Sequence, residues 1–295
     1  MIPEFFTPQD EWFDQVGRIY QLLQSVQTGE AATGYRLELR RKNRIDTVHS
    51  STAIEGNRLG LDEVAAVIGG KSIYGPERDI LEVRNAWAAY EALDTYDPCL
   101  VDDFLRAHSL LTGGLITESG RFRSRDVEIV NDHSEVLHTG SQVAKVPRLV
   151  SELLEWASTT TAHPLIASSA THFLIEHIHP FQDGNGRVGR LWQTLILSRW
   201  DPLFAWLRTE SLTAQHQPDY HAALQASREP EIDAAAFITF MLGVIEASLE
   251  DYRASVVVNG GENVVVNDAA LALIRDDARI SAARMGERPR CQRPR

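Results

Sequence analysis

The chain has 295 residues, a formal net charge of −12, a hydrophobic fraction of 43% and two cysteines. This size allows one large core or two smaller ones, and the composition is typical of a soluble globular protein. The acidic balance argues against a general nucleic-acid binder, which usually carries a basic surface. Two cysteines cannot form a disulfide framework, and we find neither a signal peptide nor an apolar run of about 18 residues, so we expect a cytoplasmic protein that does not enter a membrane.

Hydrophobic periodicity predicts a mainly helical chain. In the first helical region Trp12, Ile19 and Leu23 recur at helical spacing on one face. Further helices are expected over 35–44, 61–68, 79–93, 101–111, 147–156, 164–178, 187–200, 220–225 and 234–252. The pattern decays in residues 256–295, where we expect a degenerate or disordered tail.

One segment has the alternation of a strand. Residues 121–130 alternate between polar and apolar side chains, Asn131 and Asp132 signal a turn, and residues 136–138 can return as a second strand. We therefore expect a small β-hairpin over 121–138, with an irregular connector as the alternative.

The most informative stretch runs from His179 to Arg190 and reads His-Pro-Phe-Gln-Asp-Gly-Asn-Gly-Arg-Val-Gly-Arg. Its glycines allow backbone N–H groups to approach oxygen atoms, and a helix that begins just after them directs its positive end at an anion. Arg187 and Arg190 lie one turn apart and can bind phosphate oxygens. Because His179 precedes Pro180, we expect extended backbone there, with the imidazole ring over the glycines.

Other interpretations of this stretch are weaker. Residues 184–189 match the dinucleotide fingerprint GxGxxG, but a helix precedes them and the βαβ setting is missing. His172, His177 and His179 could suggest a metal cluster, yet one continuous helix cannot bring them together on an ion. The sequence also has no GxxxxGK[ST] motif of a P-loop.

The stretch closely resembles the signature of the Fic (filamentation induced by cAMP) family, His-x-Phe-x-Asp/Glu-Gly-Asn-Gly-Arg-x-x-Arg, at every defined position. The resemblance covers about residues 35–255 and implies an all-α, Fic-type helical core with a β-hairpin flap. Members of this family transfer AMP from ATP to a protein hydroxyl and release pyrophosphate. We therefore expect an N-terminal helical region over 1–100 and a catalytic core over 101–255.

The resemblance also implies roles for individual residues. His179 would be the general base and Asp183 the ligand of a Mg²⁺ ion that bridges the α- and β-phosphates of ATP. An anion hole and phosphate contacts would come from Gly184, Asn185, Gly186, Arg187 and Arg190. Strand addition to the target's backbone would use the flap residues Val127, Glu128, Ile129 and Val130, and Tyr220 and His221 would lie beside the adenine.

A second motif resembles the family's inhibitory sequence Ser/Thr-x-x-x-Glu-Gly/Asn. It consists of Ser51, Glu55 and Gly56, in a helix expected over about 45–57. In the resembled proteins this glutamate pairs with the second arginine of the signature, here Arg190, and ATP then binds unproductively. We expect a buried bidentate pair.

The sequence thus predicts a self-inhibited protein adenylyltransferase that acts on a Ser, Thr or Tyr hydroxyl of a target protein, with itself as a further candidate target. The alternatives are removal of AMP, transfer of another phosphate-containing group, and a catalytically silent interaction protein. A homodimer that buries the inhibitory helix would be a natural regulator, but the sequence does not determine the oligomeric state.

Overall fold

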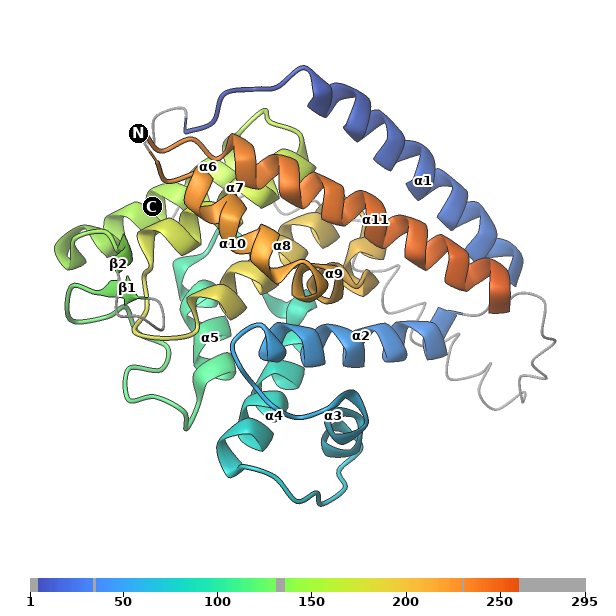
Figure 1. The fold of residues 1–295 in the computed structure, drawn as a ribbon, viewed down its shortest axis with the longest axis horizontal. Coiled ribbons are helices and arrows are strands. Elements are labelled where there is room, and N and C mark those ends of the chain that lie inside the picture. The colour runs from blue at the N-terminus through green and yellow to red at the C-terminus, as the bar shows by residue number, and fades with distance from the viewer. Residues whose placement is uncertain (1–4, 34–35, 131–135, 230, 260–295) are drawn as a thin grey trace.

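The computed structural model describes residues 5–33, 36–130, 136–229 and 231–259. Within them the chain is helical apart from one two-stranded sheet, which confirms the predicted all-α class with a small hairpin (Figure 1). Its helices are α1 (Glu11–Thr33), α2 (Arg36–Ala53), α3 (Leu61–Ile68), α4 (Glu77–Glu91), α5 (Val101–Thr112), α6 (Val146–Thr159), α7 (Pro164–Ile178), α8 (Asn185–Trp200), α9 (Thr209–Gln215), α10 (Gln217–Ala226) and α11 (Ala235–Asn259). Short 3-10 helices η1 (Leu93–Thr95), η2 (Val143–Lys145) and η3 (Pro202–Trp206) connect them.

Helices α7 and α8 pack against each other at the centre of the molecule. Helix α7 is buried on nearly every side, because α6, α8 and α11 all pack on it. Its sequence fits that position, since a helix that is apolar around its circumference is a core helix. The chain leaves α7 at Ile178 and enters α8 at Asn185, so residues 179–184 form a short link held by two rigid helices.

Helices α1 and α11 lie side by side along one edge of the molecule (Figure 1). Trp12 is buried against α11, and its Nε1 donates a 2.8 Å hydrogen bond to Oγ1 of Thr239. Arg18 pairs with Glu246 at 2.6 Å on the exposed side of the contact. The predicted apolar face of α1 is therefore confirmed, because Trp12, Ile19 and Leu23 are all buried.

The flap hairpin is shorter than the alternation predicted. Strand β1 (Glu128–Val130) pairs in antiparallel fashion with β2 (Val136–Thr139), and Ile129 faces His138 in the register. Residues 121–127 were expected as strand but are irregular. Arg123 explains the difference, because its side chain turns inward and is only 3% exposed.

Two expectations about organisation stay predictions. The division near residue 100 is one of them. The degenerate tail is the other, because residues 260–295 lie outside the described part of the chain. In the described helices, none is both long and apolar enough to span a bilayer.

Candidate active site

His179 ends α7 in a left-handed conformation, with φ 53° and ψ 62°. The expectation of extended backbone before Pro180 was therefore wrong. The residue acts as a helix stop, because its N–H still bonds the Ile175 carbonyl at 2.9 Å while its own backbone reverses the chain. For a non-glycine residue this conformation costs about 1 kcal/mol, so the surrounding contacts must hold it.

One of those contacts comes from Arg123, which sequence reasoning missed. Its Nε donates a 2.7 Å hydrogen bond to the His179 carbonyl, and its backbone N–H bonds the Pro180 carbonyl at 3.0 Å. The other guanidinium nitrogens bond the carbonyls of Arg125 and Ser141. A single buried arginine thus ties the entry of the flap to the turn that carries His179.

The imidazole of His179 is mostly buried. Desolvation lowers its pKa to about 4, against an opposing contribution from the backbone carbonyl of Glu176. The ring is therefore neutral at pH 7, which is the form that a general base requires.

Helix α8 begins two residues earlier than predicted, at Asn185 rather than Arg187. Gly184 is its N-cap with φ 85°, and an added Cβ would lie 2.8 Å from Cγ2 of Thr112, so this position requires glycine. The Asn185 side chain folds back on Phe181, accepting from its N–H at 2.9 Å and donating to its carbonyl at 3.0 Å. The amide of Asn185 therefore shapes the turn. The first N–H groups of a helix have no intrahelical partner, which suits the start of α8 to donate to an anion.

His108 of α5 contacts the same turn at Phe181 and Asp183. Its ring stacks on Phe181 at a centroid distance of 3.6 Å. Its Nδ1 accepts from the Gly120 N–H at 3.0 Å, so the hydrogen of the neutral ring lies on Nε2, which donates to the Asp183 carbonyl at 2.9 Å. Burial lowers the pKa of His108 to about 4, so the ring is neutral at neutral pH and the two hydrogen bonds select its tautomer.

Asp183 presents its carboxylate beside the first turn of α8. Its Oδ1 accepts from the Gly184 N–H at 2.6 Å and from Nη2 of Arg187 at 3.1 Å. Its Oδ2 faces Arg78 of α4 at 3.5 Å, and the side chain is 38% exposed. Magnesium is usually held by one or two carboxylates plus substrate phosphates. A single accessible carboxylate next to an anion site fits that mode, and the described residues contain no cluster of three or more ligating side chains.

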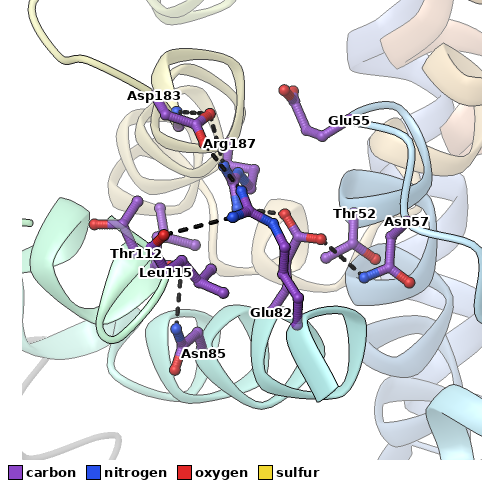
Figure 2. A network of polar contacts seen from close by, with 12 residues as sticks. Thr52, Glu55, Asn57, Glu82, Asn85, Thr112, Leu115, Asp183 and Arg187 are labelled. Carbon is purple, nitrogen blue, oxygen red and sulfur yellow. Dashed lines mark hydrogen bonds and ion pairs between the residues drawn. The ribbon is translucent and has the colours of Figure 1, made fainter. Parts of the chain in front are cut away.

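The two signature arginines point to different helices. Arg187 is buried between Asp183 and Glu82 of α4, and the carboxylate of Glu82 in turn accepts from Asn57 at 2.8 Å (Figure 2). Sequence reasoning missed Glu82, although a glutamate on the apolar face that carries Val83 and its neighbours was a usable signal.

Arg190 contacts two of the three predicted residues of the inhibitory motif, Ser51 and Glu55. Its Nε donates to Oγ of Ser51 at 3.2 Å, and its Nη2 donates to the Ser51 carbonyl at 2.9 Å and to Oε1 of Glu55 at 2.7 Å. The structure thus brings the pair together, but through one hydrogen bond and not through the bidentate contact we expected. Burial is the largest single effect and by itself would lower the pKa of Arg190, but Glu55 together with Tyr220 and Tyr90 raises the pKa on balance.

Gly186 lies where these groups meet. A Cβ there would lie 2.4 Å from Oε1 of Glu55, 3.0 Å from Nη1 of Arg190 and 3.0 Å from Oε1 of Glu176. Glu176, on α7, is a further residue that the sequence did not single out. Burial and then the nearby charge of Glu55 raise its pKa to about 6.

The residues expected beside the adenine differ in exposure. Tyr220 is buried, and its hydroxyl lies 3.2 Å from Nε2 of His172 and 3.5 Å from Glu176. His221 is on the surface, and Gln217, one turn before it, donates to the Ile54 carbonyl at 3.1 Å. In the flap, Glu128 is exposed and Ile129 is half-buried. Val127 lies outside β1, and its carbonyl accepts a hydrogen bond from the Gly140 N–H.

Comparisons with known proteins agree with this geometry. A model of the Fic/DOC family matches residues 98–197. The crystal structure of a Fic family protein from Desulfovibrio desulfuricans G20 is 41% identical, covers 92% of this chain and 80% of its own, and superposes with a TM-score of 0.81. The chain belongs to the Fic family.

Other Fic proteins extend the comparison. The protein adenylyltransferase Fic of Nematostella vectensis is 29% identical over 220 residues, and protein adenylyltransferase fic-1 of Caenorhabditis elegans is 29% identical over 223 residues. These alignments cover 72% and 70% of this chain but 49% and 40% of the relatives, so the chain spans less than half of their length. The structure of C. elegans Fic-1 (residues 134–508), at 22% identity and a TM-score of 0.63, shares the fold.

Proposed function

We propose that the protein is an adenylyltransferase that transfers AMP from ATP to a Ser, Thr or Tyr hydroxyl of a target protein. The convergence of a neutral His179, the Asp183 carboxylate and the first turn of α8 carries this proposal. The names of the curated relatives in Nematostella and Caenorhabditis support it.

In the proposed reaction the α-phosphate of ATP lies against the N–H groups at the start of α8. These donors are fixed before the reaction and stabilise the charge that develops on the phosphate oxygens. His179 takes the proton from the target hydroxyl, whose oxygen bonds to the α-phosphorus as pyrophosphate leaves. General-base catalysis of this kind contributes about 10²–10⁴ in rate.

The remaining phosphates require positive charge. Asp183 would hold a Mg²⁺ ion, which supplies charge neutralisation for the α- and β-phosphates. Arg187 would place its positive charge next to these phosphates, and Arg190 is the proposed partner of the γ-phosphate. We further propose that the flap, through strand β1, binds the target's backbone by strand addition, with Ile129 as part of that edge.

Glu55 is proposed to keep the enzyme inactive at rest. It occupies Nη2 of Arg190 at 2.7 Å, and its Oε1 lies over Gly186, where phosphate oxygens would bind. Its carboxylate therefore competes with the nucleotide both sterically and by like charge. The same glutamate could instead serve AMP removal, which is the alternative activity that this geometry also accommodates.

The test is label transfer to the protein itself and to cell extract from α-labelled and, separately, γ-labelled ATP. Wild type, Glu55→Gly and Glu55→Gly/His179→Ala are compared. We expect label from the α position only, raised by Glu55→Gly and abolished by the double change. Label from the γ position would replace AMP transfer by phosphate transfer, and equal labelling by wild type and Glu55→Gly would remove self-inhibition.

A further inference from the structure

Glu82 is a buried carboxylate outside the signature and outside the inhibitory motif. It lies on α4, and its side chain is only 11% exposed. Its Oε1 accepts from Nη1 of Arg187, and its Oε2 accepts from Nδ2 of Asn57 at 2.8 Å. One carboxyl group thus contacts an arginine of the phosphate site and the segment that follows Glu55.

The contact with Arg187 determines how that arginine is directed. Arg187 has 3% of its side chain exposed, and its Nε is buried without an acceptor in the described structure. Its two terminal nitrogens therefore carry its interactions, one to Glu82 and one to Asp183 at 3.1 Å. Without Glu82, a buried guanidinium would lose a charged partner, and that loss is far costlier than the loss of an exposed pair.

The contact with Asn57 attaches the turn that carries Glu55, here called the inhibitory turn (residues 54–57), to α4. Asn57 Nδ2 also donates to the Asp79 carbonyl at 3.0 Å, and the Arg58 N–H bonds the Asp79 carboxylate at 3.3 Å. Asn57 is two residues beyond Glu55, with Gly56 at φ 91° between them. Backbone bonds from the N–H groups of Glu55 and Asn57 to the Thr52 carbonyl join this turn to α2, and the Asn57 side chain attaches it to α4. The attachment to α4 is therefore a second hold on the turn that presents Glu55 to Arg190.

We propose that Glu82 is a positioning residue that directs Arg187 toward the nucleotide phosphates and, through Asn57, anchors the turn that carries Glu55. The phosphate site and the inhibitory turn are then joined by two routes, Glu55 with Arg190 and Asn57 with Glu82 and Arg187. In Figure 2 the Glu82 carboxylate lies between Arg187 and Asn57. The nucleotide part of this proposal rests on the proposed function, whereas the anchoring part does not.

The two roles separate in binding and transfer experiments. Isothermal titration gives the dissociation constant of Mg·ATP, and α-labelled ATP gives the transfer rate. In the Glu55→Gly background, adding Glu82→Gln should weaken ATP binding about tenfold, because Arg187 then loses the charged partner that fixes its direction. Adding Asn57→Ala to that background should leave binding within about twofold, since Arg187 keeps its carboxylate. In the wild-type background Asn57→Ala should instead raise transfer several-fold.

The control is Asn85→Ala, one turn along α4 from Glu82. Asn85 bonds the carbonyls of Leu111 and Gly113, so its loss loosens α4 without touching Arg187 or Asn57. Unchanged ATP binding by Glu55→Gly/Glu82→Gln, or an equal effect of Asn85→Ala, would overturn the role of Glu82 at Arg187. Unchanged transfer by Asn57→Ala would overturn the anchoring role.

Urea unfolding keeps the anchoring role testable if the protein proves not to use ATP. Glu82→Gln and Asn57→Ala act on one shared hydrogen bond, so the double variant should lower the midpoint clearly less than the two single shifts added together. Fully additive shifts would show that the two residues are not coupled. Failure of Glu55→Gly to bind or transfer from ATP would instead reject the proposed function alone.

Discussion

Oε1 of Glu55 lies 2.7 Å from Nη2 of Arg190, and this one hydrogen bond joins the inhibitory glutamate to the signature helix. Ser51 takes the other contacts, with Oγ accepting from Nε and its carbonyl from Nη2. Ser51 is buried, whereas Glu55 is 26% exposed at its side chain. If the glutamate contact is lost, Arg190 therefore keeps two hydrogen bonds to the serine.

Ser51→Ala should therefore loosen Arg190 without removing Glu55. The variant loses the Nε–Oγ hydrogen bond and leaves a buried donor unpaired, which should lower the free energy of unfolding by about 1–3 kcal/mol. Chemical denaturation measures this loss, and the matched control is Ser50→Ala, whose hydroxyl contacts Ser211 and not Arg190. Transfer by Ser51→Ala should also change relative to that control, and identical transfer by the two variants would contradict the role of Ser51.

Gly184 and Gly186 are close in sequence but should respond differently to alanine. Gly184→Ala places a Cβ 2.8 Å from Thr112 at φ 85°, so we expect a loss of about 1–2 kcal/mol or more in unfolding free energy. Gly186→Ala meets only the ends of long side chains, those of Glu55, Arg190 and Glu176, and gains helix propensity, so its stability should stay within about 1 kcal/mol of wild type. Thermal unfolding compares them, and equal losses would show that steric contact at Thr112 does not decide the requirement.

The neutral state of His179 predicts the pH dependence of transfer. Burial lowers its pKa to about 4, so the base form persists as pH falls from 8 toward 5. In the Glu55→Gly variant kcat/KM should stay level over this range and fall only as pH approaches 4. Circular dichroism at each pH separates this fall from unfolding. A midpoint near 6.5, the ordinary pKa of imidazole, would mean that the ring is not buried during catalysis.

Glu176 predicts a pH dependence of stability. Burial, then Glu55, raises its pKa from 4.5 to about 6, so folding favours the protonated carboxyl. That stabilisation is fully present below pH 4.5 and is lost as pH rises through 6. Glu176→Gln keeps a neutral group, so at pH 7.5 its unfolding free energy should exceed that of wild type by up to about 2 kcal/mol.

Urea denaturation at pH 4.5 and 7.5 tests this difference. The gain from Glu176→Gln should shrink at the lower pH, where wild type also carries a neutral side chain. A gain of the same size at both pH values would assign the effect to packing and not to ionisation.

Local patterns determined much of this protein. Helical periodicity predicted the helices, and the twelve residues from His179 to Arg190 predicted an anion site. The second prediction needs only local information, because an anion site at a helix N-terminus is built from backbone N–H groups of residues that are adjacent in sequence. The same local logic failed at the ends of elements. It placed the start of α8 two residues late and gave His179 extended backbone, since the left-handed stop depends on contacts from Arg123.

Only the tertiary structure decided that Glu82 meets Arg187, 105 positions further along the chain. Glu55 and Arg190 are 135 positions apart, and their pairing was expected from the family resemblance and not from any periodicity along the chain. The buried state of Glu82 and Glu176 depends likewise on how α4 and α7 pack against other helices. Sequence patterns report the surroundings of a residue within a few turns, whereas ion pairing and desolvation depend on distances across the folded core.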